Sequence, residues 1–155
     1  MDGLNVTTPA NGGIEIAFDD TQRTRLDLLV DSHLHALREG DIESVMSTIT
    51  EDVEYDLVGS SVNSIRGKEA VRFHHLQEFA NTMHERDIPL RRLIGRGFVV
   101  DELIWEGRVT GRVGSLAGNG RRVSQRILRI FEVREERIAR QSIYTDFAAI
   151  SRQLA

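Results

Sequence analysis

The sequence predicts an α+β domain in which helices fill the first half of the chain and a sheet fills the second. Apolar residues recur at helical spacing from about residue 20 to residue 83, and strand-like alternation dominates from about residue 90 to residue 145. Pro89 stands between the two regions, where it would end a helix. Helices and strands segregated in this way are typical of the α+β class.

Length and composition restrict the class of protein. The 155 residues suffice for one domain with a core and a ligand cavity, and the absence of cysteine excludes disulfides and thiolate chemistry. No apolar run approaches the ~20 residues of a membrane span. The net charge is −4 and the arginines are scattered, whereas nucleic-acid-binding proteins have a clustered basic surface. We therefore expect a cytoplasmic protein whose partner is a small molecule or a protein, and not a membrane or a nucleic acid. No His, Asp and Glu residues have the spacing of metal ligands, so no metal is expected.

The N-terminal segment differs in composition from the rest of the chain. Residues 1–19 are expected to be a flexible tail or arm, because the first 13 residues hold few large apolar side chains. Ile14, Ile16 and Phe18 have strand period and could lie on the domain or on a partner. Residues 20–155 are expected to form a single domain.

The first two helices are predicted from spacing and caps. The first runs from a cap at Asp20 or Thr21 to Gly40, a residue that commonly terminates helices. A short second helix covers residues 42–49. The apolar stripe of the first helix, at i, i+4, i+7 and i+11, consists of Leu26, Val30, His33 and Leu37.

A strand and a third helix follow. Residues 53–58 alternate apolar and acidic residues, which places Tyr55 and Leu57 inward and Asp56 outward. After a polar loop, Gly67 precedes a helix that Pro89 is expected to end. The predicted apolar stripe of that helix consists of Phe73, Leu76, Ala80 and Met83.

The second half of the chain predicts long antiparallel strands and a dimer. The strands cover about residues 90–97, 98–112, 121–134 and 137–145, and a short helix or turn closes the chain. The strand over 121–134 is apolar on both faces, with Leu128 and Ile130 on the face opposite Phe131. Helices can cover only one face, so a homodimer through the sheet is expected to cover the other.

Several short stretches carry a family resemblance. They are Arg38–Ile42, Ile65–Val71, Gly120–Val123, Arg137–Arg140 and Tyr144–Phe147. In this order and spacing, the chain resembles the nuclear-transport-factor-2-like superfamily over about residues 21–155, specifically its SnoaL-like polyketide cyclase branch. The resemblance implies a cone-shaped, curved antiparallel sheet wrapped around a pocket that three helices close. Many members act on polyketides, steroids or terpenoid epoxides, and others bind without chemistry.

Catalytic positions of two branches are missing here. Gly111–Gly114 and Gly120–Arg122 stand where SnoaL-like cyclases carry a His and an acid. Arg108–Thr110 and Ile143 stand where limonene-epoxide-hydrolase-like enzymes carry an Arg-x-Asp triplet and a second Asp. The resemblance therefore disfavours epoxide hydrolysis.

The catalytic positions of the ketosteroid-isomerase-like branch fall partly on polar residues of this sequence. Its Asp base falls at Leu57 by one count and at Asp56 by another. Its paired oxyanion donors fall at His33 and Arg129, and a supporting Tyr falls at His75. The donors are thus replaced by other polar groups.

These positions supply the candidate catalytic residues. His33 would be the acid/base and His75 its orienting partner, because an imidazole within an apolar stripe costs about 1–3 kcal/mol if it stays unsatisfied. Arg129 would stabilise an oxyanion together with Tyr55, and Asp56 is the alternative base. The structural alternatives stay open: both histidines could be satisfied core residues, and Arg129 could pair with an acid.

The ligand-binding candidates surround the predicted pocket. Tyr55 can donate a hydrogen bond to a carbonyl, Trp105 can form an apolar wall, and Asp146 could instead cap the C-terminal helix or pair with Arg129. The full set is Tyr55, Leu57, Trp105, Phe131, Tyr144 and Asp146.

The functional hypothesis combines the pocket with these groups. It is a small SnoaL-like enzyme, without cofactor, that binds a polyketide, terpenoid or steroid-like molecule and catalyses cyclisation, isomerisation or dehydration by proton transfer. The alternative is a non-catalytic binding protein or dimeric interaction module of the same fold, which the missing carboxylate base favours.

Overall fold

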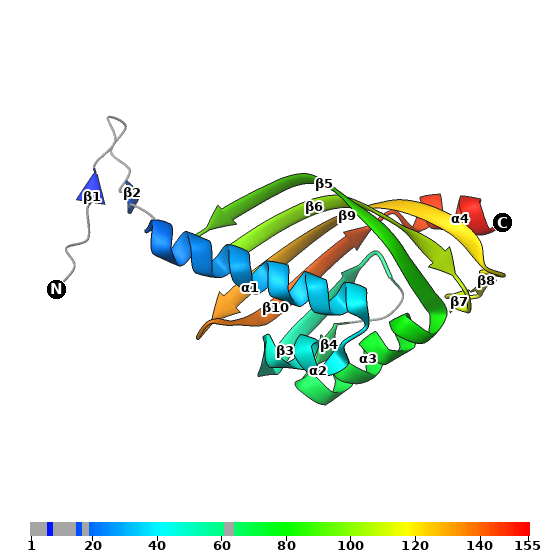
Figure 1. The fold of residues 1–155 in the computed structure, drawn as a ribbon, viewed down its shortest axis with the longest axis horizontal. Coiled ribbons are helices and arrows are strands. Elements are labelled where there is room, and N and C mark those ends of the chain that lie inside the picture. Colours follow the sequence, from blue (N-terminus) through cyan, green and yellow to red (C-terminus); the bar gives the residue numbers. More distant parts are fainter. Residues whose placement is uncertain (1–5, 8–14, 17–18, 61–63) are drawn as a thin grey trace.

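The computed structural model describes residues 6–7, 15–16, 19–60 and 64–155. Its main sheet has the strand order β4-β3-β10-β9-β6-β5, and α1 lies across one face of it (Figure 1). The strands are β3 (Ile49–Val58), β4 (Ile65–Arg66), β5 (Thr82–Gly95), β6 (Phe98–Val109), β9 (Arg121–Arg134) and β10 (Arg137–Thr145). The helices are α1 (Asp20–Glu39), α2 (Ile42–Ser47), α3 (Lys68–Asn81) and α4 (Phe147–Leu154). The predicted α+β class is confirmed.

Two small hairpins complete the structure. One pairs β1 (Val6–Thr7) with β2 (Glu15–Ile16), and the other pairs β7 (Arg112–Val113) with β8 (Leu116–Ala117). The sequence analysis expected a strand at Ile14, Ile16 and Phe18. The structure describes only residues 15–16 of this segment, so Ile14 and Phe18 lie outside the described residues.

The sheet is mixed. Most neighbouring strands are antiparallel, but β3 and β10 run parallel, with Tyr55 opposite Gln141 and Leu57 opposite Ile143. A tight turn at Glu135 and Glu136 joins β9 to β10, as expected. The sequence predicted the antiparallel hairpins because they are local in the chain, whereas the β3–β10 pair joins distant segments.

Side-chain and backbone caps set the helix ends. The Asp19 carboxylate accepts a hydrogen bond from the Thr21 amide at 3.0 Å, so the cap lies just before the predicted Asp20 or Thr21. Gly40 ends α1 in the left-handed conformation, with φ of 67°, and donates to the carbonyls of Ala36 and Leu37. The second helix ends at Ser47, and β3 begins at Ile49, earlier than predicted.

The core lies between α1, α2 and the face of the sheet that α1 covers, called here the inner face. Buried residues of α1 meet buried residues of β3, β6 and β9 there, with Val30, Val99 and Phe131 fully buried. A smaller cluster joins α4 to the far ends of β6 and β9 through Val109 and Ile150.

The prediction for the third helix was wrong in two respects. The helix ends at Asn81, and Pro89 lies within β5, an edge strand with a bulge between Pro89 and Arg91. An edge strand tolerates proline because it has a free hydrogen-bonding side. The buried residues of α3 are Val71 and His75, whereas Phe73 of the predicted stripe is 66% exposed.

The opposite, outer face of the sheet has no described helix over its centre (Figure 1). Leu128 and Ile130 lie there, half-buried, and a shallow hollow of about 570 Å³ opens near the Arg126–Glu102 ion pair. Among the described helices, none is long and apolar enough to cross a membrane.

Candidate functional site

A cavity of about 560 Å³ lies between α1, α3 and the inner face of the sheet. Its volume is in the range of small-molecule sites. Four residues singled out from the sequence line it: Tyr55, Leu57, Trp105 and Arg129. Apolar side chains from the sheet and α4, such as Ile127 and Phe147, supply much of the remaining wall.

Strand alternation separates cavity residues from outer-face residues. Leu57 lines the cavity, so its neighbour Asp56 points the other way, where its carboxylate lies 3.5 Å from Nη2 of Arg140. Tyr144 is 44% exposed and stands opposite Leu128 on the outer face. The structure therefore places both Asp56 and Tyr144 outside the cavity.

His33 lies in the core beneath the cavity and does not line it. Its side chain is fully buried, with Nδ1 2.7 Å from Oγ1 of Thr48 and Nε2 3.2 Å from Oε1 of Gln141. Burial first, and then the positive charges of His75 and Arg129, lower the pKa of His33 to about 3. A neutral imidazole with both nitrogens engaged is a positioning group, so the acid/base role expected of it does not fit this placement.

Phe131 and Asp146 also lie outside the cavity. Phe131 is fully buried and meets the ring of His33 edge-on at 5.8 Å. Asp146 caps α4, since its Oδ1 accepts from the Ala149 amide at 2.8 Å. Both residues therefore act in this structure through packing or capping.

A histidine pair on α3 borders the cavity. His75 is buried and its Nδ1 lies 2.8 Å from Oε2 of Glu78, whereas His74, which is not among the candidates from the sequence, lines the cavity. Burial alone would raise the pKa of Glu78, but hydrogen bonds from both histidines outweigh it and lower this pKa. The ring of Tyr55 is 5.0 Å from that of His74. Burial, assisted by the charge of Glu78, raises the pKa of Tyr55, which stays a hydrogen-bond donor.

Several cavity-lining residues of the sheet carry buried polar atoms without partners. Arg129 Nε and Nη1, Gln125 Oε1, Gln141 Nε2 and Thr145 Oγ1 are buried and make no hydrogen bond with the part of the chain that the structure describes. All four residues line the cavity. Buried polar groups in folded proteins are nearly always satisfied, so these atoms indicate where a ligand would supply partners.

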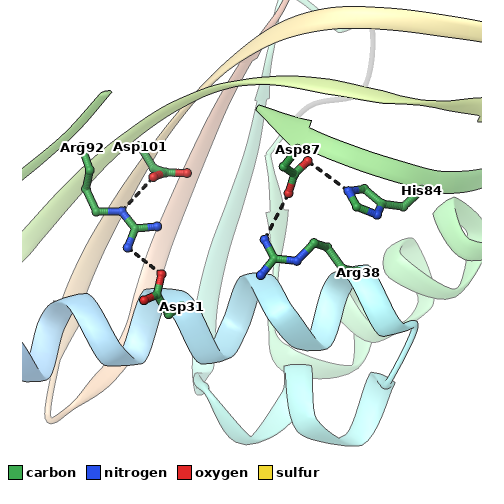
Figure 2. Close-up of polar contacts among 6 residues, drawn as sticks. All are labelled: Asp31, Arg38, His84, Asp87, Arg92 and Asp101. Carbon is green, nitrogen blue, oxygen red and sulfur yellow. Dashed lines mark hydrogen bonds and ion pairs between the residues drawn. The ribbon is translucent and has the colours of Figure 1, made fainter. Parts of the chain in front are cut away.

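A linked trio of charged and titratable side chains lies on the cavity wall. Asp87 stands between two partners (Figure 2): its Oδ2 accepts from Nη1 of Arg38 at 3.1 Å, and its Oδ1 lies 3.1 Å from Nε2 of His84. All three residues line the cavity, and the side chain of Asp87 is only 10% exposed. The ring of His84 is 6.2 Å from that of Trp105. Sequence reasoning missed this trio.

A β-bulge explains why His84 and Asp87 share one face. They are three positions apart, which in a regular strand would turn them to opposite sides. The ladder of β5 shifts between His84 and Arg86, so His84 stands opposite Gly107 and Asp87 opposite Trp105, both inner-face positions of β6. The sequence analysis had placed these residues in a helix, where a spacing of three also puts two side chains on one face, but nothing in a helical pattern pairs them with Trp105 of β6.

A second ion-pair cluster fastens α1 to the sheet beside the core. Arg92 of β5 contacts Asp31 of α1 and, through Nε, Asp101 of β6 at 2.8 Å (Figure 2). Asp27 completes the cluster at 2.6 Å. Among the described residues, no three His, Asp or Glu side chains are grouped so that they could hold a metal ion.

Comparisons with known proteins agree with this geometry. The model of the SnoaL-like polyketide cyclase family matches residues 27–154. A candidate polyketide cyclase from Xanthomonas campestris has a similar structure, with a TM-score of 0.74 and 20% identity over 86% of this chain and 98% of its own. No curated protein matches the sequence.

Two further solved structures share the fold. An LEH-like epoxide hydrolase from M. tuberculosis is 23% identical, with a TM-score of 0.68 over 86% of this chain and 91% of its own. A candidate isomerase from Bacillus subtilis is 16% identical, with a TM-score of 0.72 over 88% of this chain and 95% of its own. At these identities the likeness establishes the fold, a curved sheet with helices.

Proposed function

This chain belongs to the SnoaL-like polyketide cyclase family, and we propose that it is an enzyme that binds an apolar, oxygen-bearing molecule in the cavity and transfers a proton on it. The reaction would be a cyclisation, isomerisation or dehydration of a polyketide, terpenoid or steroid-like substrate, without a cofactor. The proposal keeps the cytoplasmic location expected from the sequence. It rests on one observation, the His84–Asp87 pair on the cavity wall.

The Asp87 carboxylate prepares His84 to act as a base. As an acceptor it holds the hydrogen on Nε2, which leaves the lone pair on Nδ1. Nδ1 makes no hydrogen bond with the described residues, so a substrate C–H or O–H group can approach it. When Nδ1 takes up a proton, Asp87 stabilises the imidazolium, as the carboxylate of a catalytic triad does.

Arg38 has a positioning role in this arrangement. Its guanidinium binds Oδ2 of Asp87, the oxygen that does not contact His84, and its side chain is 35% exposed at the cavity wall. Two partners on one carboxylate fix the position of Asp87. A rigid carboxylate in turn limits rotation of the His84 ring, which favours a productive geometry.

Trp105 and Gln125 complete the end of the cavity near His84. They are register partners on β6 and β9, and Trp105 is itself opposite Asp87, so the three form one row across the sheet. The indole offers an apolar wall. The unpartnered Oε1 of Gln125 can accept a hydrogen bond from a substrate hydroxyl, which would orient the molecule beside His84.

The residues first considered for catalysis take other parts in this proposal. His33 and His75 support the cavity from beneath, and Tyr55 is a donor to a ligand oxygen at the opposite end. Epoxide hydrolysis is not proposed, since Arg108 pairs with Glu85 and does not line the cavity, and Ile143 offers no carboxylate.

A deuterium-exchange experiment tests the proposal. 2-Tetralone, a bicyclic ketone with acidic C–H groups, would be incubated with the protein in D₂O and followed by NMR. We expect faster exchange than in buffer, and a loss of about 10²–10⁴-fold of the acceleration in His84→Ala. His35→Ala is the matched control, because His35 is exposed on α1, and it should exchange at the wild-type rate.

The alternative function is a non-catalytic binding protein. It is favoured by the observation that two of the cavity carboxylates, Glu78 and Asp87, already accept hydrogen bonds from histidines. Quenching of Trp105 fluorescence by 2-tetralone, without any acceleration of exchange, would support this alternative and contradict the enzymatic proposal.

A further inference from the structure

Arg129 is a cation on the inner face of β9 for which the described residues supply no ion-pair partner. Its Nε and Nη1 atoms are buried and form no hydrogen bond with any described residue, and no carboxylate oxygen of those residues is within ion-pair distance. A guanidinium cannot lose its proton under ordinary conditions. The positive charge therefore persists at the wall of a largely apolar cavity.

Two acids of the inner face and the cavity wall have other partners. Asp101 is the register partner of Arg129 on β6, but its Oδ1 accepts from Nε of Arg92 at 2.8 Å. Glu78 lies on the α3 side of the cavity and accepts from His75 at 2.8 Å. Neither carboxylate forms an ion pair with Arg129, a residue that lines the cavity, so no described acid neutralises its charge.

Two neutral donors flank the same position. Ile143 of β10 is the register partner of Arg129, and Gln141 and Thr145 stand two residues to either side of it on the same face. Gln141 Nε2 and Thr145 Oγ1 are buried without a partner among the described residues. His33 donates from Nε2 to Oε1 of Gln141, which turns the amide nitrogen of Gln141 away from His33.

From this arrangement we propose that the ligand of the cavity is an apolar molecule that carries a carboxylate, and that Arg129 binds this carboxylate. The inference rests on the proposed function and names the substrate class of the same site. Gln141 and Thr145 supply further donors to the carboxylate oxygens. A carboxylate is the planar anion that guanidinium groups bind best in proteins.

The register also orients the ligand. On β9, Arg129 is the register partner of Asp101, and Gln125 is the register partner of Trp105. Asp101 and Trp105 are four residues apart on β6. Four residues of a strand span about 13 Å. The carboxylate would thus be held at one end of the cavity, while the apolar body extends toward Trp105 and the reacting carbon meets His84.

A neutral ligand would leave the charge of Arg129 unpaired. A buried, unpaired charge is costly, and a carbonyl oxygen offers Arg129 a hydrogen bond without cancelling its charge. Two consequences follow. Acids should bind better than neutral molecules of the same shape, and the free protein should become more stable when the charge of Arg129 is removed.

A binding series with matched probes tests the first consequence. Benzoate, 2-naphthoate and 2-anthroate would be compared with their primary amides at constant ionic strength, using Trp105 fluorescence of the full chain. We expect at least one acid to bind tenfold or more tightly than its amide, and Arg129→Gln to abolish this difference. In Arg126→Gln, on the outer face of the same strand, the difference should persist.

Two results would overturn the proposal: no acid binding better than its amide to the wild-type protein, or an undiminished preference in Arg129→Gln. The thermal midpoint of ligand-free Arg129→Met gives an independent readout. A higher midpoint than that of the wild type supports an unpartnered cation, and a lower one contradicts it. His84→Ala should retain the acid preference, so failure of the proton-transfer proposal remains distinguishable from failure of this one.

Discussion

The Nε2 atom of His33 lies 3.2 Å from Oε1 of Gln141, so a fully buried imidazole on α1 holds an amide that lines the cavity on β10. Thr48 holds the other nitrogen of the ring. The core and the cavity are therefore connected by hydrogen bonds, and a change in the charge of His33 should affect both.

The first prediction concerns stability against pH. The pKa of His33 is about 3 in the folded protein and near the ordinary 6.5 in the unfolded chain. Between these values the unfolded chain binds the extra proton, so the free energy of unfolding should fall as pH decreases from 6.5. The slope from this group approaches about 1.4 kcal/mol per pH unit.

Urea denaturation at pH 7, 6 and 5 measures this slope. These pH values lie above the pKa of ordinary carboxyl groups, so carboxylates contribute little to it. His33→Gln removes the titrating group and should lose most of the dependence. Equal slopes in the two proteins would show that another group causes it.

The second prediction concerns the orientation of His84. Asp87→Asn keeps the shape of the side chain but removes the charge that fixes the ring and stabilises its protonated form. The accelerated exchange of 2-tetralone should fall by about 10²-fold or more, with binding little changed. Asp31→Asn, a surface carboxylate of the neighbouring Arg92 cluster, should exchange normally; equal losses in both variants would indicate a general effect of charge.

The third prediction concerns a close approach of the backbone to Trp105. A Cβ atom at Gly107 would lie 2.3 Å from the Trp105 ring and 2.4 Å from the backbone oxygen of Met83. Gly107→Ala should cost about 1–3 kcal/mol of stability and shift Trp105 emission, because the backbone oxygen cannot easily move. At Gly95 the contacts are with the ring of the exposed Phe98, so Gly95→Ala should be nearly neutral. Similar costs at the two glycines, measured by urea denaturation, would contradict this reasoning.

The fourth prediction concerns assembly. The half-buried Leu128 and Ile130 and the exposed Tyr144 are adjacent on the outer face, across β9 and β10. We expect a homodimer through this face, with a mass near twice 17.5 kDa in sedimentation equilibrium at micromolar concentration. Ile130→Lys should shift the mass toward that of one chain. A wild-type mass of 17.5 kDa would rule the dimer out.

Much of the fold could be predicted because its signals are local. The α1 stripe, Gly40 and the turn at Glu135 depend on neighbours within a few residues, and the structure has them where they were expected. The end of α3 could not be located in this way, since apolar residues continue at helical spacing through Met83 into β5. What decides the boundary is pairing with β6, a tertiary interaction.

The candidate site was predictable only in part for the same reason. Alternation placed Tyr55 and Leu57 on the inner face, and both line the cavity. His33 shares the buried stripe of α1, but periodicity cannot distinguish a core position from a cavity wall. His84 and Asp87 face the same side only because a bulge adds one residue to β5, and no periodic pattern reveals a bulge.

The parallel pairing of β3 with β10 affects how the chain folds. Ile49 and Ile138 are register partners, although nearly the whole sheet lies between them in the sequence. During synthesis, β3 emerges long before the only long strand that it pairs with, and its buried side chains must wait for β10. Folding should therefore be slow, because it depends on the pairing of these distant segments.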